Sequence, residues 1–283
     1  MVVWLNSVNT PQRKNDMNPT ASIETPELPL QVARDGAVVT LRFNRPKALN
    51  AVDIPMAQAI LRAARELVDD RSVRAIVLCG AGRGFMAGGD LATLRADPNR
   101  GASELIGPLH EAITLLSQMD APLIAQVHGV AAGAGLSLML QADFIIAAEG
   151  TRFSLAYANI GASCDVGASW ALPRLVGLRR ALEIAMLGET LTTADAARLG
   201  LVNRVAPAAE LEAEVKAFAQ RLANGPTVAF GQLRRLMRES FSRDLPAQLD
   251  AEAAAFIKCA GTQDFKTGID AFFAKQPAHF EGR

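Results

Sequence analysis

Three short apolar segments that alternate with helical stretches constrain the fold of this chain most strongly. Residues 74–79, 123–127 and 144–147 have the length and composition of strands buried on both faces of a parallel sheet. Parallel strands need crossovers between them, and these crossovers are right-handed in nearly all proteins. The alternation therefore predicts a layered α/β fold. The other elements expected in this half of the chain are a strand at 37–43 and helices at 54–68, 103–119 and 133–141.

From residue 166 onward the pattern changes to amphipathic helices, with one further strand expected at 201–205. Residues 1–29 are rich in Asn, Thr, Pro and Ser and show little periodicity, which predicts a disordered extension. The chain is thus expected to comprise this extension, an α/β core over 30–205 and a helical C-terminal region over 206–283. The C-terminal half is expected to hold helices at 166–176, 178–187, 193–199, 208–223, 227–241, 246–259 and 263–274.

The charge balance argues against one class of partner. The chain has 29 basic and 29 acidic residues, whereas a nucleic-acid groove needs clustered Lys and Arg. The most apolar window, 121–140, is interrupted by polar and glycine residues, so no membrane span is expected. Three widely spaced cysteines fit a reducing compartment. We expect a soluble, cytoplasmic protein.

Neither a metal nor a dinucleotide cofactor is expected. His110, His128 and His279 show no ligand spacing with cysteines or carboxylates. A loose G-x-G-x-x-A pattern at 82–87 follows a strand, but the acidic residue that a dinucleotide site requires about 20 residues further on is missing.

Two glycine-rich segments, 86–90 and 129–135, lie where a strand ends and a helix begins. Such positions leave backbone N–H groups without partners, and small residues let a ligand approach them closely. Each segment alone is compatible with a tight turn. Together they predict a two-donor oxyanion hole for a carbonyl that becomes an enolate.

Five segments resemble the crotonase (enoyl-CoA hydratase/isomerase) superfamily, in the order and spacing of that family. The resemblance implies a ββα spiral core with a helical C-terminal trimerisation region. It also implies an acyl-CoA thioester substrate, with coenzyme A entering as part of the substrate rather than as a cofactor, and a homo-oligomer that is a trimer or a dimer of trimers. The segments are Arg45-Pro-Lys-Ala-Leu-Asn-Ala51, Gly84-Phe-Met-Ala-Gly-Gly-Asp-Leu91, Gly129-Val-Ala-Ala-Gly-Ala-Gly135, Leu172-Pro-Arg-Leu-Val-Gly177 and Leu199-Gly-Leu-Val-Asn-Arg-Val205.

Carried over position by position, the resemblance makes the backbone N–H groups of Gly89 and Ala134 the oxyanion donors. Alanine at 134, where many relatives have glycine, implies a negative φ there. The residues implied for the substrate pocket are Met86, Ser137 and Tyr157, and those implied for CoA binding are Arg45, Lys47, Ala87, Asp90 and Leu91.

The chain departs from the hydratases of this family at both catalytic glutamates. Ser137 and Tyr157 occupy those two positions, and neither can replace a carboxylate base near neutral pH. One carboxylate remains nearby, Asp165, at a position that resembles the acid/base aspartate of several enoyl-CoA isomerases. An alternative makes Asp165 only the N-cap of the helix expected at 166–176.

Three functions follow from these residues. The favoured one is double-bond isomerisation of an enoyl-CoA with Asp165 as acid/base. The second resembles 4-chlorobenzoyl-CoA dehalogenase, with Asp165 as nucleophile and His110 activating water. Tyr157 stands where that enzyme would have tryptophan, and aromatic residues make up only 5% of the chain. The third is a catalytically silent acyl-CoA-binding protein. The variable segment 91–109 contains no recognisable code for the acyl group.

Overall fold

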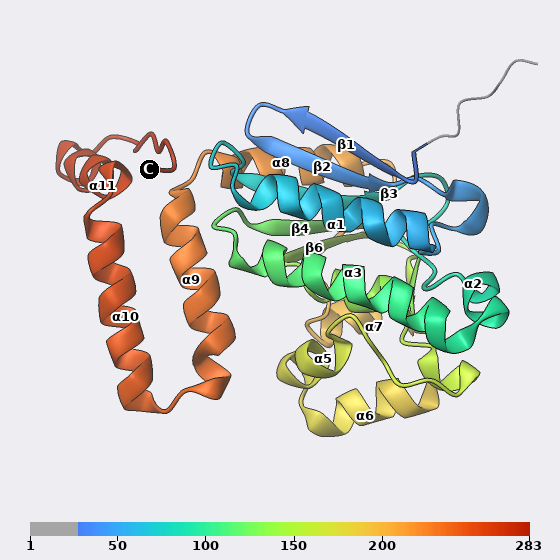
Figure 1. Cartoon of the computed structure of the whole chain (residues 1–283). Coiled ribbons are helices and arrows are strands. Elements are labelled where there is room, and N and C mark those ends of the chain that lie inside the picture. Colours follow the sequence, from blue (N-terminus) through green and yellow to red (C-terminus); the bar gives the residue numbers. More distant parts are fainter. Residues whose placement is uncertain (1–27) are drawn as a thin grey trace, which may run out of the picture.

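A six-stranded sheet organises the computed structural model, which describes residues 28–283 (Figure 1). The predicted disordered extension, 1–29, lies outside the described residues except for its last two. The strand order is β1-β2-β3-β4-β6-β9; β1 and β2 are antiparallel and every other neighbouring pair is parallel. The strands are β1 (Leu30–Asp35), β2 (Val38–Phe43), β3 (Ala75–Gly80), β4 (Leu123–Val127), β6 (Phe144–Ala148) and β9 (Arg204–Ala206).

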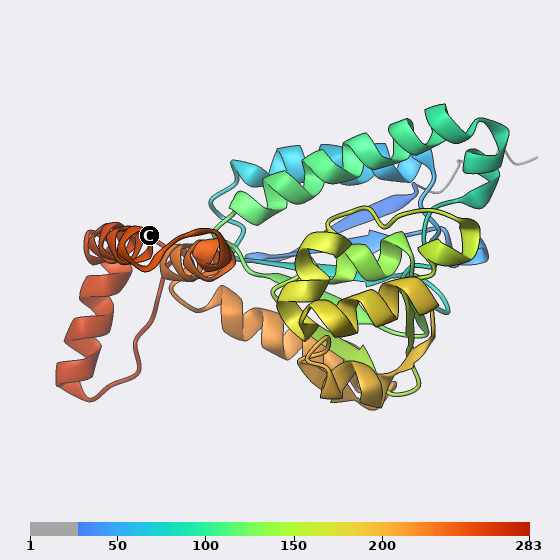
Figure 2. The ribbon, with the colours of Figure 1, turned by 90° about the horizontal axis from the view of Figure 1, so that it is seen from below.

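Helices cover both faces of this sheet. Helices α1 (Ile54–Val68) and α3 (Pro98–Gln118) lie on one face, and α8 (Leu211–Ala223) lies on the other (Figure 2). Alternate side chains of β3 serve the two layers: Ile76 and Leu78 belong to the core under α1 and α3, whereas Ala75 and Val77 pack with α8. Burial on both faces explains why the central strands are continuous apolar runs in the sequence.

A second, three-stranded sheet has the order β5-β7-β8. Its strands contain only two or three residues each, so the sequence shows no strand period there and the sheet was not predicted. The strands are β5 (Val130–Ala132), β7 (Arg152–Ser154) and β8 (Leu191–Thr192). Of the short helices, α4 and α7 contact this sheet. The short helices are η1 (Pro46–Ala48), α2 (Leu91–Ala96), α4 (Ala134–Met139), η2 (Tyr157–Ile160), α5 (Ala168–Val176), α6 (Leu178–Leu187) and α7 (Thr193–Arg198).

The last three α-helices form an arm that stands to one side of the sheet (Figure 1). They are α9 (Thr227–Glu239), α10 (Leu245–Ala260) and α11 (Gln263–Ala274), with η3 (Ser240–Ser242) between the first two. A largely buried cluster of charged residues attaches α9, the first helix of the arm, to the core. Asp143 forms ion pairs with Arg234 at 2.6 Å and Arg238 at 2.9 Å, and it accepts a hydrogen bond from the Leu123 N–H at 2.8 Å. Arg234 also donates to the carbonyl groups of Met119 and Ala121.

The predicted elements are largely confirmed. The helices at 54–68, 178–187 and 263–274 and the strand at 123–127 agree with the structure to the residue. The helix expected at 103–119 begins earlier, at Pro98, because the Asp97 side chain caps it and proline fits its first turn. The three cysteines, Cys79, Cys164 and Cys259, are not joined in disulfides. Within residues 28–283, no helix is long and apolar enough to cross a membrane.

Gly135 permits close packing between α4 and the backbone at residue 86. A Cβ added at this position in α4 would lie 2.2 Å from the Met86 carbonyl oxygen, whereas one added at Gly107 in α3 would meet nothing within 4 Å. We therefore expect Gly135→Ala to lower the free energy of unfolding by about 1–3 kcal/mol through overpacking.

The matched control is Gly107→Ala, which should raise stability by up to about 1 kcal/mol through helix propensity. Urea unfolding at one fixed protein concentration measures both variants. Equal stability of the two variants would contradict the close contact between α4 and residue 86.

Candidate functional site

The loops that follow β3 and β4 lie against each other at one edge of the sheet. This follows from the parallel pairing of the two strands, which brings their carboxyl ends together. Backbone hydrogen bonds join the loops from Phe85 N–H to the His128 oxygen (2.9 Å), from Met86 N–H to the Val130 oxygen (3.1 Å) and from Ala132 N–H to the Met86 oxygen (2.9 Å). The two glycine-rich segments predicted to cooperate are therefore neighbours.

The Gly89 N–H is aimed by a hydrogen bond on the other side of its own peptide. The Gly88 carbonyl accepts from Val52 N–H at 2.8 Å. The described peptides contain no cis bond, and the C=O and N–H of a trans peptide point in opposite directions. The Gly89 N–H consequently points away from Val52, and Gly89 lines a cavity at this edge of the sheet.

The Ala134 N–H is aimed in the same way. The Gly133 carbonyl accepts from Ser137 N–H at 3.0 Å within the first turn of α4, so the Ala134 N–H points out of the helix start. Gly133 has a φ of 50°, while Ala134 is not among the described residues with positive φ, which confirms the sign predicted for it. A Cβ added at Gly88 would lie 3.8 Å from the Ala134 nitrogen. Two free N–H donors thus lie side by side on one cavity wall.

The cavity has a volume of about 550 Å³ and a mostly apolar lining. Helices α2 and α3 form one wall of it, opposite η2 and the segment that follows η2. This apolar wall was not predicted from the sequence, although the spacing of its leucines along α3 is helical. The wall residues on α2 and α3 are Leu91, Leu94, Ala102, Leu105, Ile106 and Leu109.

Of the described residues that line the cavity, Asp165 alone carries a carboxylate. Its Oδ1 accepts a hydrogen bond from the Tyr157 hydroxyl, which also contacts the Ser137 hydroxyl at 3.0 Å. The Tyr157 hydroxyl donates its proton to Asp165. In the hydrogen bond between Ser137 and Tyr157, the Ser137 hydroxyl is therefore the donor. The two residues that replace glutamates therefore form a chain of hydroxyl groups ending on Asp165.

The alternative role of Asp165 as a helix cap is wrong. Helix α5 begins at Ala168, and no side chain caps it. Val166 and Gly167 adopt left-handed backbone conformations, with φ of 54° and 77°, which place the helix start two residues later than the sequence pattern indicated. The Asp165 carboxylate is left free to face the cavity and Tyr157.

His110 lies near this site but outside the cavity lining. It is exposed on α3, and its Nε2 accepts a hydrogen bond from the Val166 N–H at 3.1 Å. The lone pair that a general base needs is thus engaged by the backbone beside Asp165. In this arrangement the imidazole supports the Asp165 segment.

The remaining predicted site residues occupy different depths. Ala87 and Leu91 line the cavity. Met86 and Ser137 are fully buried behind its lining, and Lys47 is exposed.

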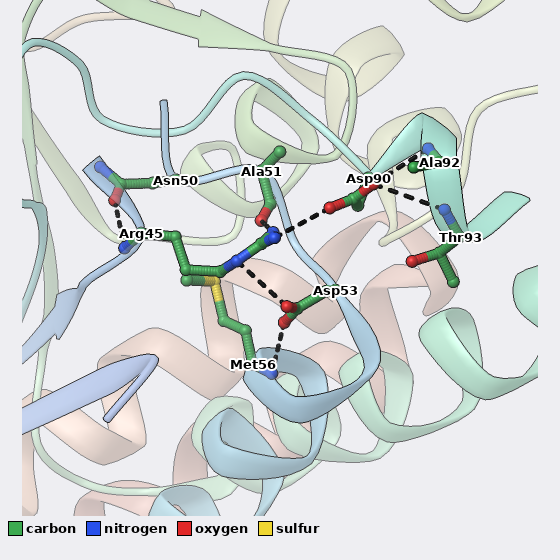
Figure 3. Close-up of polar contacts among 8 residues, drawn as sticks. All are labelled: Arg45, Asn50, Ala51, Asp53, Met56, Asp90, Ala92 and Thr93. Carbon is green, nitrogen blue, oxygen red and sulfur yellow. Dashed lines mark hydrogen bonds and ion pairs between the residues drawn. The ribbon is translucent and has the colours of Figure 1, made fainter. Parts of the chain in front are cut away.

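Arg45 and Asp90 meet in a polar cluster (Figure 3), and Asp90 directly follows Gly89 in the sequence. Arg45 forms ion pairs with Asp90 at 2.9 Å and with Asp53 at 3.0 Å, and donates to the Ala51 carbonyl. Burial raises the pKa of Asp90, but hydrogen bonds from Arg45 and from backbone N–H groups outweigh it, so the pKa lies below its usual range. Asp53 was not singled out from the sequence, although its position before the helix at 54–68 is typical of an N-cap.

Comparison with known proteins places these features in a family. The sequence profile described as "Enoyl-CoA hydratase/isomerase" matches residues 33–283. The chain belongs to this enoyl-CoA hydratase/isomerase family. Members of the family process acyl-CoA thioesters, and no group of residues in the described part of this chain could hold a metal ion.

Relatives in the family carry different activities. A protein named "Probable enoyl-CoA hydratase" from Rhodobacter capsulatus is 36% identical over 89% of this chain and 97% of its own length. The 1,2-epoxyphenylacetyl-CoA isomerase of Escherichia coli is 33% identical over 87% of this chain and 95% of its own. The crystal structure of an enoyl-CoA hydratase from Mycobacterium smegmatis has a TM-score of 0.84 and 32% identity, covering 89% of this chain and 98% of that one. The crotonase fold predicted from the sequence motifs is thereby confirmed.

The hydroxyl chain makes Tyr157 a reporter of the site, since it is the single tyrosine of the sequence. Burial, followed by the nearby Asp165 carboxylate, raises the pKa of Tyr157 far above its ordinary value. We expect the native protein to show no tyrosinate absorbance up to about pH 10, the ordinary tyrosine pKa, whereas the denatured protein should titrate near it. Because the folded pKa is the higher one, stability should fall as pH rises above the unfolded value.

Asp165→Asn removes the smaller of the two causes, so its tyrosinate transition should move to lower pH and still lie above that of the denatured protein. Tyr157→Phe provides the blank. A native transition at the denatured position would contradict the buried hydroxyl chain.

Proposed function

We propose that the chain isomerises a carbon–carbon double bond in an enoyl-CoA thioester. The observation that carries this proposal is the placement of Asp165, the single carboxylate on an apolar cavity that also presents two free N–H donors. In this proposal the thioester oxygen accepts hydrogen bonds from Gly89 and Ala134. These donors are already oriented, so they stabilise the enolate without reorganisation.

Asp165 moves one proton in two steps. Its carboxylate removes a proton from the α carbon of a β,γ-enoyl thioester, and the C–H electron pair passes into a dienolate whose charge rests on the thioester oxygen. The protonated Asp165 then returns the proton to the γ carbon, and the double bond forms between the α and β carbons. The aspartate is regenerated, and no water or redox partner is consumed.

The hydroxyl chain supports isomerisation over hydration. Tyr157 donates to one oxygen of Asp165 and thereby fixes the orientation of the carboxylate. Ser137 and Tyr157 bring no second carboxylate to activate a water. The apolar wall formed by α2 and α3 suits an aliphatic acyl chain. For CoA binding we retain Lys47, Ala87 and Leu91 through the family resemblance, whereas Arg45 and Asp90 are engaged with each other.

Asp165→Asn tests the proposal with little change of shape, since asparagine can still accept from Tyr157. We expect kcat on a β,γ-enoyl-CoA to fall by about 10²–10⁴, the contribution of a positioned acid/base, while binding of the product thioester is unchanged. Appearance of the conjugated enoyl thioester measures turnover. Glu111→Gln, an exposed residue of α3 paired with Arg65, is the control that should retain full activity.

Two other functions predict different experimental outcomes. In the dehalogenase alternative, single turnover of a halobenzoyl-CoA in isotopically labelled water leaves label in Asp165. The engagement of His110 by the Val166 N–H disfavours it, because the water-activating base is not on the cavity. A silent binding protein would bind thioesters but turn over none of a panel of enoyl, dienoyl, epoxyphenylacetyl and halobenzoyl esters.

The partner of the C-terminal arm is proposed to be a second copy of this chain. The arm exposes large apolar side chains that one core does not cover, among them Phe256 (65% exposed), Ile257 (71%), Phe272 (78%) and Phe273 (78%). Helix α6 exposes a second apolar set, including Leu178 and Met186. Contact between unlike patches repeats around a ring, which fits a trimer or a dimer of trimers.

Sedimentation equilibrium at micromolar concentration should accordingly give three or six times the chain mass. Replacing Phe272 and Phe273 by serine should shift the mass toward the monomer, because each exposed ring buries apolar surface only in the assembly. A monomeric mass for the unmodified protein would contradict the proposal.

A further inference from the structure

The Arg45 side chain joins the starting points of two helices. Asp53 caps α1 by accepting from Met56 N–H at 2.9 Å, and Asp90 caps α2 by accepting from Ala92 N–H at 2.9 Å. The guanidinium group lies between these two carboxylates (Figure 3). Its three nitrogens are all engaged, by Asp53, Asp90 and the Ala51 carbonyl.

Residues 45–53, here called the strap, hold the Gly89 peptide from one side. The strap contributes Leu49 and Val52 to a short backbone ladder with residues 87–90: Ala87 N–H donates to Leu49 at 3.0 Å, Val52 N–H donates to Gly88 at 2.8 Å, and Asp90 N–H donates to Val52 at 2.8 Å. The middle bond is the one that aims the Gly89 N–H at the cavity. The position of Val52 therefore sets the direction of that donor.

The ion pairs of Arg45 hold the strap against residue 90. Arg45 connects one end of the strap to Asp53 at its other end, and both to Asp90, the residue directly after Gly89. The cluster is partly buried, with side chains 18–25% exposed. Removing the guanidinium would leave two carboxylates facing each other, and their repulsion would separate the strap from residue 90.

We propose that Arg45 is a positioning residue for the Gly89 N–H, acting through Asp90 and the strap rather than by contact with substrate. This inference rests on the proposed function, in which that N–H stabilises the thioester oxyanion. The fork geometry of arginine suits this role, because it spans two carboxylates and a carbonyl at once, which a lysine ammonium on a single stem does not do.

The test is Arg45→Met, compared with the unmodified enzyme in three measurements. We expect kcat to fall by about 10- to 100-fold, part of the loss seen when an oxyanion donor is removed outright. We expect the Kd for free CoA, which has no thioester carbonyl, to be unchanged. Bound hexadienoyl-CoA, whose absorption moves to longer wavelength when its carbonyl is polarised, should show a smaller red shift.

Three further variants sharpen the result. Asp90→Asn keeps a capping oxygen but loses the ion pair, so it should reproduce the change in red shift; it also serves if Arg45→Met does not fold. Arg45→Lys should restore part of kcat and part of the red shift. Arg65→Met breaks an exposed ion pair with Glu111, remote from the strap, and should leave all three measurements unchanged.

The outcomes separate this inference from the proposed function. A normal red shift and kcat in Arg45→Met would overturn the positioning role. A large rise in the Kd for free CoA with a normal red shift would also overturn it, and would make Arg45 a CoA ligand instead. Absence of any red shift in the unmodified enzyme would overturn the proposed function itself, because no carbonyl would then be polarised at Gly89 and Ala134.

Discussion

The site depends on the close approach of two backbone segments, 86–89 and 131–135. Each segment supplies one N–H, and each N–H is directed by the carbonyl of its own peptide, held by Val52 on one side and by Ser137 on the other. Because the trans peptide is planar, a hydrogen bond that holds its C=O also fixes the direction of its N–H. The geometry of the cavity wall is thereby set by contacts outside the cavity, and the absence of a side chain at residue 135 is what lets α4 come near enough.

Asp165, the group proposed to be catalytic, stands out because two neighbouring positions lack a carboxylate. With serine and tyrosine in place of two glutamates, Asp165 is the one carboxylate among the described residues that line the cavity. Tyr157 lies between Ser137 and Asp165 and remains a donor, because its pKa is raised by burial and by the carboxylate itself. A carboxylate held by a permanent donor keeps one oxygen oriented, which suits a proton that leaves one carbon and returns to another two atoms away.

Elements with a repeating side-chain period could be predicted from the sequence. The helix at 54–68 was predicted to the residue from its early proline and regular apolar spacing. The strands of the small sheet were not, because two or three residues carry no period. The predicted start of α5 was two residues too early, because no local sequence signal indicates the left-handed backbone at Val166. The family resemblance identified Gly89, Ala134 and Asp165, but the contacts of Arg45 with Asp90 and of Tyr157 with Asp165 join residues that only the folded chain brings together.

The ion cluster that attaches α9 to the core has a consequence for association. Asp143 ties Arg234 and Arg238 of α9 to the beginning of β4, so the direction of the arm is fixed by the core of its own subunit. A surface that is already ordered loses little conformational entropy when it is covered. In the proposed assembly, copies of the chain would dock as preformed shapes, and the ion cluster inside each subunit would set the orientation of the docking surface.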